Sequence, residues 1–237
     1  MKMFKIIEKI AYAESIYPSP LFDTSNRLYS FVNPYGYHLV RKNLSLFERL
    51  DGLYVDGILM CVFIRAFYRI KVVRRSFDLT TVARDLFNRI KETGETIYLV
   101  GAKQEEIEQT VSLIRKEYPT AHIVGFRNGY FSSNEEKLAC YNSIIELNPT
   151  FVVVGMGAVL QEQFIVDLQD QGYRGICFTC GGYLRQAASG LNYFPEWSNR
   201  FHLRAFYRLY KEKGMFKRLY NVLIEFPVLF IYDRLLH

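Results

Sequence analysis

An aspartate followed by a glycine, Asp56-Gly57, comes directly after the apolar segment Leu53 to Val55. That segment has the composition of a short strand, and open α/β sheets place their ligand sites just beyond the carboxyl ends of their strands. A carboxylate at such a position can accept the proton of a substrate hydroxyl. Asp56 is therefore the candidate general base, while a turn aspartate without chemistry stays the alternative.

A second candidate site combines two glycines with a Gln-Glu pair. The apolar run Thr150 to Val154 ends at Gly155-Met156-Gly157 and is followed by Gln161-Glu162. Such glycines allow a sharp turn and close approach of a ligand, and the N-terminus of a following helix attracts phosphate. Leu160 stands where a dinucleotide fingerprint has its third glycine, so we predict a phosphorylated ligand rather than hydride transfer. A tight turn without a ligand remains the other interpretation.

The cationic and sulfur-containing residues indicate further chemistry less clearly. Arg74 and Arg75 precede a predicted helix and could hold phosphate, although a solvated basic face has the same pattern. The four cysteines lie in apolar stretches, which suggests a reducing compartment. Cys177 and Cys180 form a Cys-x-x-Cys, but zinc would need two further ligands at suitable spacing, so a metal or redox role is disfavoured.

The acidic residues bear on metal dependence. No two aspartates are separated by a single residue, so the Asp-x-Asp pair with which many enzymes hold a divalent ion at a diphosphate is missing. We therefore expect no metal cofactor, with arginines, a lysine and helix N-termini in the place of the cation.

Repeated units of strand, glycine turn and helix position these residues. The expected strands are 28–32, 53–55, 96–100, 121–125, 151–154 and 175–179, and the expected helices are 37–50, 79–92, 104–117, 135–147 and 161–171. This alternation predicts an α/β fold, a doubly wound, mostly parallel Rossmann-like sheet with right-handed crossovers. With 237 residues, half of them apolar, the chain can bury a sizeable core.

Six segments follow one another in a fixed order: Tyr54 to Gly57, Ile97 to Lys103, Ile123 to Phe131, Val154 to Glu162, Thr179 to Leu184 and Phe201 to Arg208. Together they resemble the WecG/TagA/CpsF glycosyltransferases of bacterial surface-polysaccharide and teichoic-acid synthesis. Each segment by itself is weak evidence for the family, whereas six segments in the order and spacing of the family are specific evidence. The chain departs from the family pattern at Val159 and Leu160, which replace Pro-Lys, near Arg185, where an aspartate is common, and at Tyr193 to Pro195.

The resemblance implies an inverting transfer of a sugar, of the N-acetylmannosamine type or a related hexose, from a UDP-sugar to a polyprenyl-diphosphate-linked saccharide. Asp56 would be the catalytic base. The expected donor-binding residues are Asn33, Gly101, Lys103, Asn128, Gly155, Gly157, Gln161, Glu162, Gly181 and Gly182. The expected acceptor or phosphate-binding residues are Arg74, Arg75, Arg200, Arg204 and Arg208. Because of the departures, a non-catalytic nucleotide-sugar or phosphate-binding protein of the same fold is the alternative.

The last stretch, Trp197 to His237, holds eight Lys or Arg residues against three acids, a charge of +5 out of the +6 of the whole chain, and is rich in aromatic residues. An anionic membrane surface attracts such a segment. We expect a catalytic domain over 1–195 and a helical membrane- or acceptor-binding appendage over 196–237. A packed helix pair with a solvated basic face is the alternative, and nucleic-acid binding is disfavoured.

The sequence shows no secretory signal and no segment that could span a membrane. We therefore predict a cytoplasmic protein attached peripherally to the inner face of the cell membrane. Homo-oligomerisation stays open.

Overall fold

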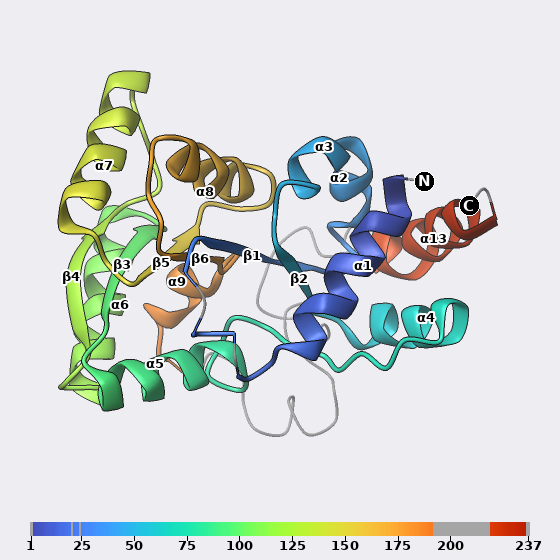
Figure 1. Ribbon diagram of the computed structural model, residues 1–237, viewed down its shortest axis with the longest axis horizontal. Coiled ribbons are helices and arrows are strands. Elements are labelled where there is room, and N and C mark those ends of the chain that lie inside the picture. The colour runs from blue at the N-terminus through green and yellow to red at the C-terminus, as the bar shows by residue number, and fades with distance from the viewer. Residues whose placement is uncertain (1, 20, 24, 192–218, 236–237) are drawn as a thin grey trace.

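The computed structural model describes residues 2–19, 21–23, 25–191 and 219–235. These residues form a six-stranded, all-parallel sheet with the strand order β2-β1-β6-β5-β3-β4, covered by helices on both faces (Figure 1). The strands are β1 (Arg27–Val32), β2 (Gly52–Val55), β3 (Thr96–Gly101), β4 (His122–Arg127), β5 (Phe151–Gly155) and β6 (Ile176–Thr179). The predicted doubly wound α/β fold is confirmed.

Alternate residues of the strands other than the edge strand β4 enter two separate cores, one on either face of the sheet. In β5, Val152 and Val154 join the first core, and Phe151 and Val153 join the second. A strand covered on both faces has no reason to alternate apolar and polar residues, which explains the uninterrupted apolar runs in the sequence.

The helices divide between these two cores. The first core receives side chains from most of α1 (Lys2–Ser15) and from α2 (Tyr37–Lys42), α3 (Leu44–Phe47), α4 (Ile58–Tyr68), α7 (Asn134–Leu147), α8 (Leu160–Asp170) and α13 (Phe226–Leu235). The second core receives them from α5 (Val82–Thr93), α6 (Gln104–Glu117) and α9 (Tyr183–Ala187). Every strand and helix predicted from sequence periodicity has a counterpart here, with boundaries that differ by a few residues.

One predicted helix was wrong in its extent. The single helix expected over 37–50 is divided at Asn43, whose backbone leaves the helical region at φ −125° and ψ 34°. The Asn43 side-chain amide donates a hydrogen bond of 2.8 Å to the carbonyl of Leu39. Asparagine competes with the helix for backbone partners in this way, so the apolar spacing continues through a break in the helix.

The C-terminal helix α13 packs on α2 and α4. Its Phe226 and Phe230 are buried, and their rings contact Tyr37 with centroid separations of 5.3 and 5.6 Å. Asp233 is also buried; it accepts a hydrogen bond of 2.9 Å from the Tyr37 hydroxyl and pairs with Arg41 at 2.8 Å. The buried side of α13 is therefore part of the main core, although the division predicted between 195 and 196 falls outside the described residues.

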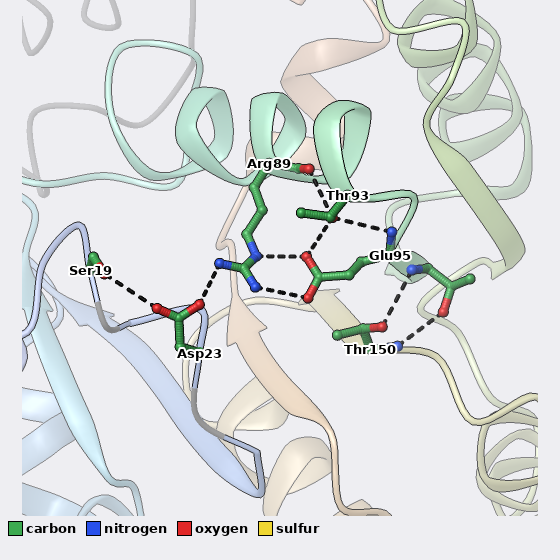
Figure 2. A network of polar contacts seen from close by, with 7 residues as sticks. Ser19, Asp23, Arg89, Thr93, Glu95 and Thr150 are labelled. Atoms are coloured by element: carbon green, nitrogen blue, oxygen red, sulfur yellow. Dashed lines mark hydrogen bonds and ion pairs between the residues drawn. The ribbon is translucent and has the colours of Figure 1, made fainter.

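A polar network ties α5 to the amino-terminal end of the sheet (Figure 2). Arg89 pairs with Glu95 at 2.6 Å and with Asp23 at 2.6 Å. Close by, the backbone N–H of Thr150 donates to the hydroxyl of Thr96 at 3.1 Å. Burial raises the pKa of the Glu95 carboxyl, but its bonds to Arg89 and Thr93 outweigh this and the net pKa is lowered. This network lies at the edge of the sheet opposite the strand ends that carry the predicted site residues.

Candidate functional site

The carboxyl ends of β1 and β2 bring Asn33 and Asp56 side by side. The strands pair through Val32 and Val55, and the Asp56 N–H donates a 2.8 Å hydrogen bond to the carbonyl of Val32. A side chain at Gly57 would begin 2.7 Å from the ring of Pro34, so this turn needs glycine. The Asn33 side chain accepts the Gly36 N–H at 2.8 Å and fixes the neighbouring turn.

Arg74 provides the charge next to Asp56. Its Nη2 lies 3.0 Å from Asp56 Oδ1 and also donates to the hydroxyl of Ser76 at 2.8 Å. The Asp56 side chain is 38 % exposed, so a substrate can reach the carboxylate. Arg74 was predicted to bind the acceptor or a phosphate, which stays a prediction, and sequence spacing gave no sign that it pairs with the candidate base.

Arg75 has other partners than Arg74. Its guanidinium lies 2.8 Å from Glu14 of α1 and 3.7 Å from the centroid of the Tyr17 ring. The predicted phosphate-binding role of Arg75 stays a prediction, and its observed partners belong to the packing of α1. The predicted Arg200, Arg204 and Arg208 lie outside the described residues.

The glycines at the central strand ends fall into two kinds. A Cβ at Gly101 would lie 2.4 Å from the carbonyl oxygen of Gly155, and a Cβ at Gly155 would lie 2.7 Å from the sulfur of Cys180. These two glycines let neighbouring strand ends pack closely. Gly157 and Gly181 have φ values of +85° and +56°, and no heavy atom of the described residues lies within 4 Å of the position of a Cβ there. Open space at a glycine is what close approach of a ligand requires.

Gln161 and Glu162 come directly behind these turns, and both are buried. Glu162 accepts hydrogen bonds from the Ser30 hydroxyl at 2.7 Å, from Gln161 Nε2 at 2.8 Å and from the Val159 N–H at 2.5 Å. Burial is the largest influence on this carboxyl and raises its pKa, which the bonds from Gln161 and Ser30 partly oppose. Direct contact of these two residues with a donor stays a prediction; their observed partners are protein groups.

The residues predicted from β3, β4 and β6 complete the edge. Lys103 is exposed after β3, and Gly182 precedes the first residue of α9. Asn128, after β4, donates to the side chain of Gln104 at 2.9 Å. Strands in a sheet are about 4.8 Å apart, so β4 lies about 24 Å from β2 along the edge. The predicted residues thus lie along the whole edge, some at β2 and β1, some at β3 and β4, and the rest at the turns of β6 and β5 between them.

Sequence reasoning missed Ser30 and Thr179, which lie inside buried strands. The Thr179 hydroxyl donates to the Ser30 hydroxyl at 2.7 Å, and Ser30 in turn donates to Glu162. A polar residue within an otherwise apolar strand was the available signal. Cys177 and Cys180 are buried, and burial raises the pKa of both thiols, that of Cys180 to about 12. Such thiols are inert, in agreement with the disfavoured redox role.

Comparison with known proteins agrees with this arrangement. Residues 20–237 match the glycosyl transferase WecG/TagA/CpsF family. The chain is 35 % identical over 207 residues, 87 % of its own length and 86 % of the relative, to a UDP-Gal:alpha-D-GlcNAc-diphosphoundecaprenol beta-1,4-galactosyltransferase of Shigella boydii. It is 28 % identical over 141 residues, 60 % of its own length and 54 % of the relative, to an N-acetylglucosaminyldiphosphoundecaprenol N-acetyl-beta-D-mannosaminyltransferase of Bacillus subtilis (strain 168). The chain belongs to the WecG/TagA/CpsF family of glycosyl transferases.

Proposed function

We propose that this protein transfers a hexose, with inversion at the anomeric carbon, from a UDP-sugar to a saccharide linked to polyprenyl diphosphate. The observation that carries the proposal is the position of Asp56, an accessible carboxylate at a strand end, paired with Arg74 at 3.0 Å and next to the Asn33 turn. Family membership supports the reaction class.

The chemistry follows from these positions. Asp56 takes the proton of the acceptor hydroxyl as its oxygen bonds to the anomeric carbon of the donor. The bond from that carbon to the diphosphate oxygen breaks, and UDP leaves with the electron pair. The open turns at Gly157 and Gly181 and the N-terminus of α8 supply backbone N–H groups for the negative charge on the leaving diphosphate. In this proposal the transfer does not need a divalent ion.

The relatives favour a particular donor and acceptor. The galactosyltransferase matches along most of both chains, whereas the mannosaminyltransferase matches about half of its own length. We therefore favour UDP-galactose over the N-acetylmannosamine donor expected from the sequence, and N-acetylglucosaminyl diphosphoundecaprenol as the acceptor. Both choices rest on the activities of these two relatives.

The C-terminal helix supports attachment to a membrane. None of the helices in the described part of the chain is both long and apolar enough to span a bilayer. The outward side of α13 and of the preceding π-helical turn η1 (Asn221–Glu225) is nevertheless apolar and exposed; its residues are Leu223, Ile224, Val228, Ile231 and Leu235. We call these five residues the outer apolar face. A basic chain with such a face suits reversible binding to the anionic inner surface of the cell membrane.

One experiment tests the reaction. The purified protein is incubated with a short-chain N-acetylglucosaminyl diphospho-lipid and, separately, with UDP-galactose, UDP-glucose, UDP-N-acetylglucosamine and UDP-N-acetylmannosamine. We expect UDP release and a lipid product heavier by one hexose with UDP-galactose. Transfer only from the mannosamine donor would correct the choice of sugar. Binding of a UDP-sugar without transfer from any donor would favour the non-catalytic alternative.

A second experiment tests the membrane. The structure makes truncation a poor choice, because it would remove the buried Phe226 and Phe230 from the core. Val228→Glu on the outer apolar face is the cleaner change, since Val228 is 61 % exposed. We expect weaker flotation with phosphatidylglycerol vesicles and unchanged thermal stability. Tyr12→Glu, at an exposed apolar residue of α1, is the matched control. Equal loss of flotation in both variants would contradict attachment through α13.

A further inference from the structure

Two glycine turns at the centre of the sheet are joined by one buried hydrogen-bonded unit. Gln161 Oε1 accepts the N–H of Gly181, in the turn after β6, at 3.0 Å. Gln161 Nε2 donates to Glu162, whose other oxygen accepts the N–H of Val159, in the turn after β5. Ser30 of β1 donates to the same carboxyl at 2.7 Å. Strand β1 and the turns after the neighbouring strands β6 and β5 are thus linked to one carboxyl group, the turn after β6 through Gln161.

The backbone of Val159 gives a second, independent observation. Val159 has φ +75° and ψ −47°, a conformation that a β-branched residue rarely adopts. Strained backbone of this kind persists only where surrounding contacts hold it, and it gathers at ligand sites. Val159 is held by its N–H bond to Glu162 and by the 2.9 Å bond that its carbonyl accepts from the Gln163 N–H. A proline, which the family pattern has here, could neither adopt this φ nor donate that bond.

We propose that Glu162 is a positioning residue that holds the Gly157 and Gly181 turns in the shape that receives the donor diphosphate, without touching the donor itself. This inference rests on the proposed function. Its buried position and its three protein partners leave Glu162 no exposed acceptor to offer to a ligand. The groups that meet the diphosphate are then other backbone N–H groups of the turns, since those of Gly181 and Val159 donate to Gln161 and Glu162.

The chemistry of the carboxyl group explains why a glutamate is needed. Each of its two oxygens accepts a bond, one from Val159 N–H and the other from Gln161 Nε2, and both can do so whether or not the carboxyl carries a proton. A glutamine has one acceptor oxygen and would turn its NH₂ toward one of these two donors. Glu162→Gln should therefore break one tie while preserving the size of the side chain.

Amide hydrogen exchange measures the hydrogen bonds of the Gly181 and Val159 N–H groups without any substrate. In the full chain, we expect each of the variants Glu162→Gln and Gln161→Ala to raise the exchange rate of at least one of the two amides, Gly181 or Val159. The expected increase is about tenfold, the effect of losing a buried hydrogen bond. Tyr173→Phe is the matched control, because it removes a buried 2.7 Å hydrogen bond to the carbonyl of Pro149 at the amino-terminal end of β6. It should leave both amides protected. Unchanged exchange in Glu162→Gln would overturn the inference.

Kinetics with UDP-galactose distinguish positioning from general loss of structure. We expect Glu162→Gln to raise KM for UDP-galactose at least fivefold and to change kcat less, whereas Tyr173→Phe changes neither. Because Glu162 acts partly through Gln161, the double variant should raise KM by less than the product of the single effects. A fully multiplicative double variant, or an unchanged KM, would overturn the positioning role. If the wild-type protein neither binds UDP-galactose nor transfers galactose from it, the proposed donor chemistry is overturned as well. If the wild-type protein has normal kinetics and the KM of Glu162→Gln is unchanged, this inference alone is overturned.

Discussion

Asp56→Asn separates the chemistry of the proposed base from the stability of the fold. The asparagine keeps the shape of the side chain and the backbone bond to Val32, but it cannot take a proton from the acceptor. General base catalysis typically contributes 10²- to 10⁴-fold, so we expect kcat for galactose transfer to fall by about 10²-fold or more. KM for UDP-galactose should change little, because in the proposed reaction Asp56 acts on the acceptor hydroxyl.

The structure also sets the expected cost in stability. The pair between Asp56 and Arg74 is partly exposed, and after screening by solvent such a pair contributes no more than about 1 kcal/mol. Arg74 keeps its 2.8 Å bond to Ser76 when Asp56 is replaced. For a chain of this size, 1 kcal/mol corresponds to about 2–4 °C in Tm. Differential scanning calorimetry should therefore show a shift of at most about 4 °C, far too small to explain the loss of turnover.

Asp78→Ala is the control, because Asp78 also lies near Arg74, at 3.7 Å. Asp78 accepts the Ser76 hydroxyl at 2.6 Å and the Thr80 N–H at 2.8 Å. Leaving these donors without their acceptor should cost about 2 kcal/mol, or about 4–8 °C in Tm, with turnover near normal at temperatures where the protein is folded. Turnover within tenfold of wild type in Asp56→Asn would refute the assignment. An equal loss in Asp78→Ala would point to the placement of Arg74 instead of a base.

Three further outcomes are expected. Val159→Gly should relieve strain of about 1 kcal/mol and raise Tm by about 2–4 °C in calorimetry, and a lowered Tm would contradict the strained φ. The raised pKa of Glu162 means that this group's contribution to stability is present at low pH and lost as pH rises through its folded pKa. The Tm of Glu162→Gln relative to wild type should therefore rise from pH 4 upward, and a difference that does not vary with pH would count against the shift. Galactose transfer should survive excess EDTA; loss of transfer that Mg²⁺ or Mn²⁺ restores would show that a metal holds the diphosphate.

The sequence by itself determined the periodic elements and their class. Unbroken apolar runs such as Phe151 to Val154 require burial on both faces, and each is followed by a glycine turn and an amphipathic helix, so a parallel sheet between two helix layers was predictable. The candidate base Asp56 was predictable for the same local reason, since it follows a strand and precedes a glycine. Its role in catalysis stays a prediction.

The tertiary structure alone decided which of these residues meet. The order β2-β1-β6-β5-β3-β4 sends the chain from β2 past three strands to β3, and local sequence patterns carry no information on that choice. The bond between Ser30 and Glu162 spans 132 positions, and that between Tyr37 and Asp233 spans 196. Periodicity and turn chemistry act over a few residues, whereas contacts of this range depend on how whole elements pack. The unit behind the glycine turns and the docking of the C-terminal helix could therefore be found only in the folded protein.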